Sequence, residues 1–91
     1  MVRVKRSKFL IIVNVLRIII DNPNYKTSIL ARKSNLGYYT VEHYISILVS
    51  LGFVDTSLNC KHVVSRATES GIEFCKRCEE FIKSLPEGVP I

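Results

Sequence analysis

Apolar residues lie almost all the way around the first helix that the sequence predicts, over residues 7–21. Only Asn14 and Arg17 interrupt the apolar run that starts at Phe9. A helix that is hydrophobic on so many sides is buried on more than one of them. Because 91 residues form only a small core, we expect one side of this helix to pack against a second subunit. Pro23 and its two Asn neighbours are expected to stop the helix.

A short helix and a longer helix, separated by a tight break, are predicted next. The short helix covers residues 27–34, with Thr27 as its N-cap. Gly37 is expected to provide the break, because glycine adopts backbone conformations that other residues resist. The longer helix covers residues 38–51, and Gly52 is expected to end it. The apolar spacing predicts inward-facing side chains at Ile29, Leu30, Val41, Tyr44, Ile45 and Leu48.

A β-hairpin and a final helix complete the predicted order. Short β-prone runs within residues 53–66 form the hairpin, with residues 58–61 linking its strands. Thr68 is expected to cap a helix over residues 68–85, which Pro86 ends. The broad apolar face of this helix is made of Phe74, Cys75, Cys78, Phe81, Ile82 and Leu85. The pattern predicts a single α+β, mainly α, domain over residues 1–91.

This order of elements resembles a winged helix-turn-helix domain, with a three-helix core, a hairpin wing and a C-terminal dimerisation helix. The stretch TSILARKSNLGY over residues 27–38 looks like the helix-turn-helix of small winged-helix regulators from archaea and archaeal viruses. The stretch ATESG over residues 67–71 resembles the LTEKG turn that leads many of these proteins from the wing into the last helix. The resemblance covers about residues 7–85. It implies dimeric binding to double-stranded DNA, with the third helix in the major groove and the wing over the neighbouring backbone.

The charge distribution is two-sided, which is consistent with one face of the domain meeting phosphate. The formal net charge is +5, yet residues 1–34 carry eight basic side chains and one acidic side chain, Asp21. The remaining residues carry five basic and seven acidic groups. An anionic partner on one face accounts for this asymmetry. A solvated basic arm that only keeps the chain soluble is the alternative.

Helical geometry then predicts the surface that would face DNA. If Val41, Ile45 and Leu48 face the core, polar side chains of the same helix turn outward. We expect the reading surface to consist of Tyr38, Tyr39, Thr40, Glu42, His43 and Ser46. This surface holds no Arg or Asn, so the commonest bidentate pairings with guanine and adenine are missing.

Basic residues flanking this surface are expected to contact phosphates and to make the affinity salt-dependent. The candidates are Lys26, Arg32 and Lys33 near the second helix, Lys61 and Arg66 on the wing, and Arg3, Lys5 and Arg6 in the N-terminal arm. Together these observations predict a sequence-preferring DNA-binding protein and transcriptional regulator. The alternative is a winged-helix module that binds proteins, with a wing that only completes the core and a third helix that is simply solvated.

The helices at residues 7–21 and 68–85 carry more hydrophobic surface than a domain of this length hides alone. We therefore predict a homodimer joined through them. Packing across a two-fold axis would set the spacing of two recognition helices near one turn of DNA.

The three cysteines, Cys60, Cys75 and Cys78, allow several interpretations. They are buried thiols, members of a disulfide within or between chains, or, together with His62, ligands for zinc. Intracellular disulfides occur in hyperthermophiles, the setting that the family resemblance suggests. The spacing does not suit a structural zinc site or a thiol-redox enzyme, so we expect no metal and no cofactor. A thiol-dependent or metal-dependent sensor on the same scaffold stays open as an alternative function.

The basic start and the following apolar run imitate a signal peptide. Asn14 and Arg17 interrupt that run, however, and no small-residue cleavage site follows. A helix needs about 20 apolar residues to span a bilayer, and this run is shorter. We expect an intracellular protein in the cytoplasm, or in the host cytoplasm if the protein is viral. We also expect no enzymatic activity, because no catalytic motif or glycine-rich phosphate loop is present, and no small-molecule substrate is evident.

Overall fold

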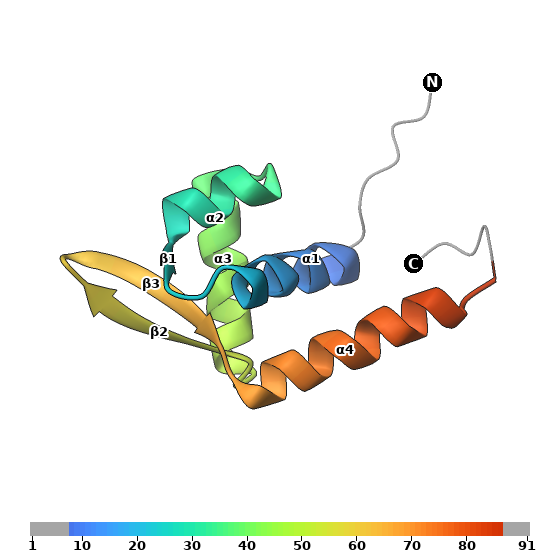
Figure 1. The fold of residues 1–91 in the computed structure, drawn as a ribbon. Coiled ribbons are helices and arrows are strands. Elements are labelled where there is room, and N and C mark those ends of the chain that lie inside the picture. The colour runs from blue at the N-terminus through green and yellow to red at the C-terminus, as the bar shows by residue number, and fades with distance from the viewer. Residues whose placement is uncertain (1–7, 87–91) are drawn as a thin grey trace, which may run out of the picture.

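The computed structural model describes residues 8–86 of the chain, in which helices surround a small core and a β-hairpin extends to one side (Figure 1). The predicted mainly helical α+β class is confirmed. The elements are α1 (Lys8–Asp21), β1 (Tyr25–Lys26), α2 (Thr27–Ser34), α3 (Tyr38–Ser50), β2 (Val54–Asn59), β3 (His62–Ala67) and α4 (Glu69–Ser84).

The core lies where α1, α2 and α3 pack against one another and against α4 and β3. The predicted stripe on α3 is confirmed, since Val41 and Leu48 are fully buried and Ile45 and Tyr44 nearly so. From α1, Leu16 and Ile19 are also fully buried. Val13 and Val15 of α1 are buried as well. Five further apolar residues of α1 are partly buried against the same core: Phe9, Ile11, Ile12, Ile18 and Ile20. Much of the apolar circumference of α1 is therefore covered within one subunit.

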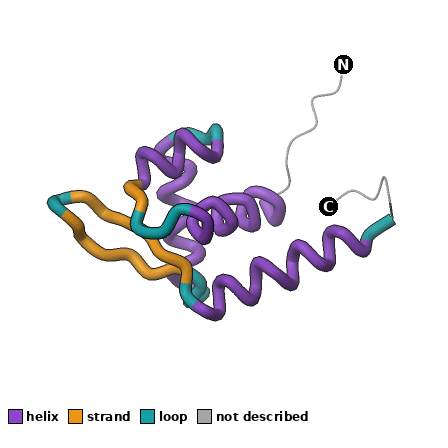
Figure 2. The backbone as a smooth tube through the Cα atoms, viewed as in Figure 1, coloured by secondary structure: helices purple, strands orange, loops and turns teal. Residues whose placement is uncertain are grey.

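The three strands form an antiparallel sheet in the order β1-β3-β2. The sequence did not predict β1, which pairs Tyr25 with Ser65 and ties the start of α2 to the wing. The hairpin strands are longer than predicted, because Leu58 and Asn59 continue to pair with β3. Only Cys60 and Lys61 form the turn, both with positive φ (50° and 70°), at the far end of the strands (Figure 2). A two-residue turn of this kind matches the twist of the strands.

Two predictions about helix ends are wrong. Thr27 is not the N-cap of α2, because Lys26 holds that position without a side-chain cap and Thr27 is buried as the first helical residue. Gly37 has an ordinary φ of −66° and is the N-cap of α3. Asn35 takes the left-handed conformation instead, with φ 59°, which asparagine tolerates better than most residues. The prediction for Gly52 is confirmed, since its φ is 80° after the end of α3.

A junction of backbone contacts joins the end of α3, the wing and the start of α4. The hydroxyl of Thr68 accepts a hydrogen bond from the Gly71 N–H (3.1 Å) and donates one to the Gly52 carbonyl (2.7 Å), so the predicted cap is confirmed. The Thr68 N–H donates to the Phe53 carbonyl (3.0 Å). The ring of Phe53 stacks on Phe74 of α4, with centroids 4.4 Å apart. This junction sets where α4 leaves the domain.

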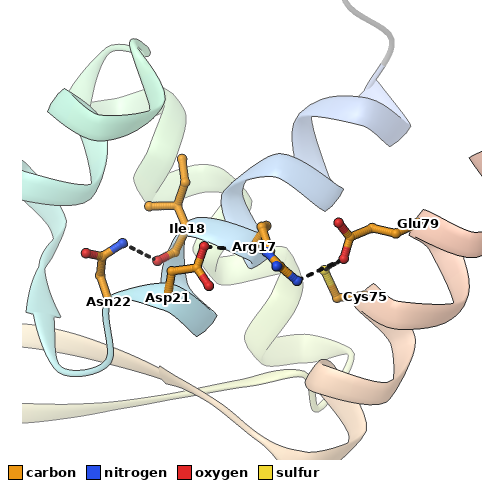
Figure 3. Close-up of polar contacts among 6 residues, drawn as sticks. All are labelled: Arg17, Ile18, Asp21, Asn22, Cys75 and Glu79. Carbon is orange, nitrogen blue, oxygen red and sulfur yellow. Dashed lines mark hydrogen bonds and ion pairs between the residues drawn. The ribbon is translucent and has the colours of Figure 1, made fainter.

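The last helix then runs beside α1 and away from the wing (Figure 1). Arg17 links the two helices, because its Nη1 donates to Oε1 of Glu79 at 3.0 Å while its Nε lies 3.4 Å from Oδ2 of Asp21 (Figure 3). Within residues 8–86, none of the helices has the length and apolar character needed to cross a membrane.

Replacing Gly71 tests the junction. Gly71→Ala should lower the free energy of unfolding by about 1–3 kcal/mol, because the added Cβ would overlap the carbonyl oxygen of Phe53. Urea unfolding followed by circular dichroism measures the change. The control is Gly37→Ala, where the added Cβ would lie 3.8 Å from Oγ1 of Thr40. It should cost less than about 1 kcal/mol, the usual cost of a weaker N-cap. Equal losses in the two variants would show that the junction is not tightly packed.

Candidate nucleic-acid interface

The side of α3 opposite the core is exposed over its whole length. All six residues that the sequence analysis placed on the reading surface are exposed: Tyr38, Tyr39, Thr40, Glu42, His43 and Ser46. Among the large hydrophobic side chains of residues 8–86, Tyr39 is the most exposed, with 81% of its surface open to solvent. Its ring meets that of Tyr38 edge to face, with centroids 5.5 Å apart. The first turn of α3 thus presents an aromatic pair to the solvent.

A groove separates α3 from the wing. Its volume is about 310 Å³, and it is lined by Thr27, Tyr38, Glu42, Ile45, Ser46, Val49, Thr56 and Val63. Thr56 and Val63 were not among the predicted site residues, because their place depends on the pairing register of β2 and β3. Val49 was also missed, although its helical position beside Glu42 and Ser46 could have identified it. Residues of α3 and of the wing therefore line one continuous surface.

A second hollow, of about 210 Å³, lies at the end of this groove and is lined by basic side chains. Lys26 at the start of α2 and Lys61 at the wing turn both line it, next to His62 and Tyr38. Segments far apart in the sequence therefore place two lysines around the N-terminus of α3. Such a cluster suits an anion that passes between the wing and the helix.

The other predicted phosphate contacts lie around this centre. Arg32 and Lys33 are exposed in the last turn of α2, and Nζ of Lys33 lies 5.7 Å from the ring centre of Tyr25. Arg66 is exposed and lies opposite Asp55 in the hairpin register. The predicted arm residues Arg3, Lys5 and Arg6 lie outside the described residues.

The cysteines are separated by the fold. Cys60 is exposed in the wing turn, whereas Cys75 and Cys78 are buried on α4, and all three are free thiols. The structure does not bring the Cys60 and His62 pair to the two cysteines of α4. No group of three or more His, Cys, Asp or Glu side chains gathers among the described residues. The zinc interpretation therefore finds no ligand set between positions 8 and 86.

The environment of Cys75 makes it a poor nucleophile. Burial raises the pKa of its thiol to about 11, and the negative charge of Glu79 acts in the same direction. Its S–H donates to Oε1 of Glu79, the oxygen that also accepts from Arg17 (Figure 3). Burial also raises the pKa of Cys78. Both thiols therefore stay protonated at neutral pH. The disulfide bonds expected from the sequence stay a prediction.

The helix-turn-helix with an adjoining hairpin defines the winged-helix class. A family model described as winged helix-turn-helix matches residues 5–85. The chain therefore belongs to the winged helix-turn-helix family.

Solved structures agree with this fold. Sso10a-2, a DNA-binding protein from Sulfolobus solfataricus, is 23% identical, with a TM-score of 0.77 over 86% of this chain and 80% of that one. The PcaV transcriptional regulator from Streptomyces coelicolor is 17% identical, with a TM-score of 0.71 over 96% and 68%. FabT from Streptococcus pneumoniae, solved in complex with DNA, is 16% identical, with a TM-score of 0.69 over 89% and 67%. At these low identities the likeness concerns the fold alone. No curated protein sequence matches the chain.

The difference in burial among the cysteines predicts an order of chemical modification. Iodoacetamide should label Cys60 in the folded protein, because its side chain is exposed. Cys75 and Cys78 should react only after unfolding, because alkylation needs an accessible thiolate. Peptide mass spectrometry measures the label at each site. A Cys60→Ser variant is the control and should take up no label while folded. Labelling of Cys75 under native conditions would contradict its burial.

Proposed function

We propose that this protein binds double-stranded DNA with sequence preference and acts as a transcriptional regulator. The observation that carries the proposal is the convergence of Lys26 and Lys61 at the N-terminus of an exposed, polar α3. In this arrangement α3 enters the major groove while the two lysines contact the phosphates that border it. The names of Sso10a-2 and of FabT in complex with DNA support the same class of ligand.

The distribution of charge supports the same orientation. Residues 22–67, which hold the second helix, α3 and the wing, contain five basic and two acidic side chains. The last helix, α4, contains three basic and four acidic side chains. DNA is therefore attracted to the wing side of the molecule and not to α4. The proposal assigns the protein no enzymatic activity.

Single lysine variants test the binding surface. Lys26→Ala or Lys61→Ala should weaken binding to duplex DNA about threefold to tenfold. Each should also lower the slope of log affinity against log salt by about 1, because one counterion-releasing contact is lost. Fluorescence anisotropy across a salt series measures both quantities.

Lys76→Ala is the matched control, since Lys76 is an exposed lysine on α4. It should leave the slope unchanged. If wild-type protein binds no duplex at low salt, the proposed function is wrong. If Lys76→Ala reduces the slope as much as Lys61→Ala does, DNA binds a different face.

We also propose that the regulator is a homodimer joined along α1 and α4. An open groove of about 400 Å³ runs between these helices, with Leu10, Val13 and Ile82 among its lining residues. Phe81 is 54% exposed on α4, well away from the wing. The groove and this exposed aromatic side chain together support an interface for a second subunit. A two-fold axis near α4 would leave both wings free for adjacent half-sites.

Phe81→Glu tests the dimer. The buried charge should shift the protein from dimer to monomer, because a carboxylate at an apolar interface loses its hydration. Sedimentation at micromolar concentration measures the distribution. Ile72→Glu is the control, because Ile72 is 43% exposed near the start of the same helix and does not line the groove. Wild-type protein that sediments as a monomer would remove the dimer from the proposal.

A further inference from the structure

Glu42 stands apart from the other residues of the proposed interface. It is the one carboxylate on α3, and α3 carries no Lys or Arg to neutralise it. Its side chain is exposed, and its carboxylate takes part in none of the hydrogen bonds or ion pairs among residues 8–86. An uncompensated negative charge on a helix that faces DNA is unfavourable unless a hydrogen-bond donor meets it.

The position of Glu42 indicates where that donor would come from. Tyr38, Glu42 and Ser46 follow one another at intervals of four, so they lie in one row along the helix. This row forms the α3 side of the groove that faces Thr56 and Val63 of the wing. Among residues 8–86, no basic side chain lines the groove, whereas Lys26 and Lys61 line the hollow at its end. We expect phosphates to be attracted to the hollow that holds the two lysines. The carboxylate of Glu42 lies in the groove without lysines, where it can meet the edges of the bases.

The base edges of the major groove offer few donors to a carboxylate. Guanine presents only acceptors, and thymine presents an acceptor and a methyl group. Adenine presents its N6 amino group between two acceptors, its own N7 and the O4 of the paired thymine. Cytosine presents its N4 amino group with an acceptor on one side only, so a carboxylate meets least repulsion there.

We infer that Glu42 is a specificity-determining residue, whose carboxylate accepts a hydrogen bond from the N4 amino group of a cytosine in the major groove. The inference rests on the proposed binding to duplex DNA. Glu42 contributes to specificity mainly by weakening binding to other bases. A guanine or thymine at the same position leaves the carboxylate facing acceptors, without a hydrogen-bond donor. Because the exposed face of α3 has no Arg or Asn, it lacks the commonest contacts that distinguish bases. The contact from Glu42 supplies part of that discrimination.

A selected duplex allows the contact to be tested. A randomised duplex library is first enriched with wild-type protein, and each cytosine of the selected duplex is then replaced by a 2-pyrimidinone nucleoside, which lacks the amino group. At one position the replacement should weaken wild-type binding about tenfold. Glu42→Ala should not distinguish cytosine from the analogue at that position. It should also bind unselected duplexes more tightly than the wild type, because a charge that repels phosphate is gone.

Two further variants separate base reading from a general effect of charge. Glu42→Gln should move the preference at that position from cytosine to adenine, since an amide pairs with both N6 and N7 of adenine. Glu69→Gln removes the same charge from an exposed carboxylate at the start of α4 and should leave every base preference unchanged.

The outcomes distinguish this inference from the proposed function. If Glu42→Ala keeps the cytosine preference at every position, or improves binding to all duplexes alike, Glu42 does not read a base. The inference is then overturned while DNA binding stands. If wild-type protein enriches no duplex from the library, DNA binding itself fails and the inference falls with it.

Discussion

The close approach of Gly71 to the carbonyl of Phe53 is the constraint on which the shape of the molecule depends. Four segments meet there: the end of α3, the start of β2, the end of β3 and the start of α4. Thr68 connects them through one hydroxyl that both donates and accepts. A side chain at position 71 would push α4 away from Phe53, and the stacking of Phe53 on Phe74 would go with it. The wing is held at its base by the same contacts, so the angle between wing and α3 depends on this packing.

The proposed phosphate contacts and the proposed base contact lie on parts of the structure that are held in different ways. The α3 helix is held by a fully buried row that includes Val41 and Leu48, which gives its outer face a defined orientation. The basic side chains lie at its edges, on the start of α2 and at the wing turn. Lysine contacts with phosphate tolerate small displacements because a charge acts over several ångströms, whereas a hydrogen bond to a base edge does not. The rigid helix thus carries the polar side chains, and the periphery carries the charge.

The sequence predicts those features of the fold that depend on local residue patterns. The apolar spacing on α3, the cap at Thr68 and the stop at Gly52 depend on residues within one or two turns, and the structure confirms them. The strand β1 has only two residues and exists through its pairing with β3, about 40 positions later, so no local periodicity indicates it. The left-handed residue before α3 is Asn35 and not Gly37, because both types tolerate that conformation and the packing of α2 decides between them. The exposed residues of α3 follow from helical geometry, but the groove beside Glu42 depends on the hairpin register.

The terminal helices change the argument for a dimer. The sequence indicated a partner because α1 is apolar on most sides, yet much of that surface is covered by α2, α3, β3 and α4 of the same subunit. The apolar surface that a partner would cover lies instead in the α1–α4 groove and at Phe81. Because α4 runs away from the wing, the C-terminal end of α4 lies far from the turn between β2 and β3 (Figure 1). A second subunit bound there would cover neither α3 nor the wing, so the proposed dimer and the proposed DNA contacts would not compete for the same residues.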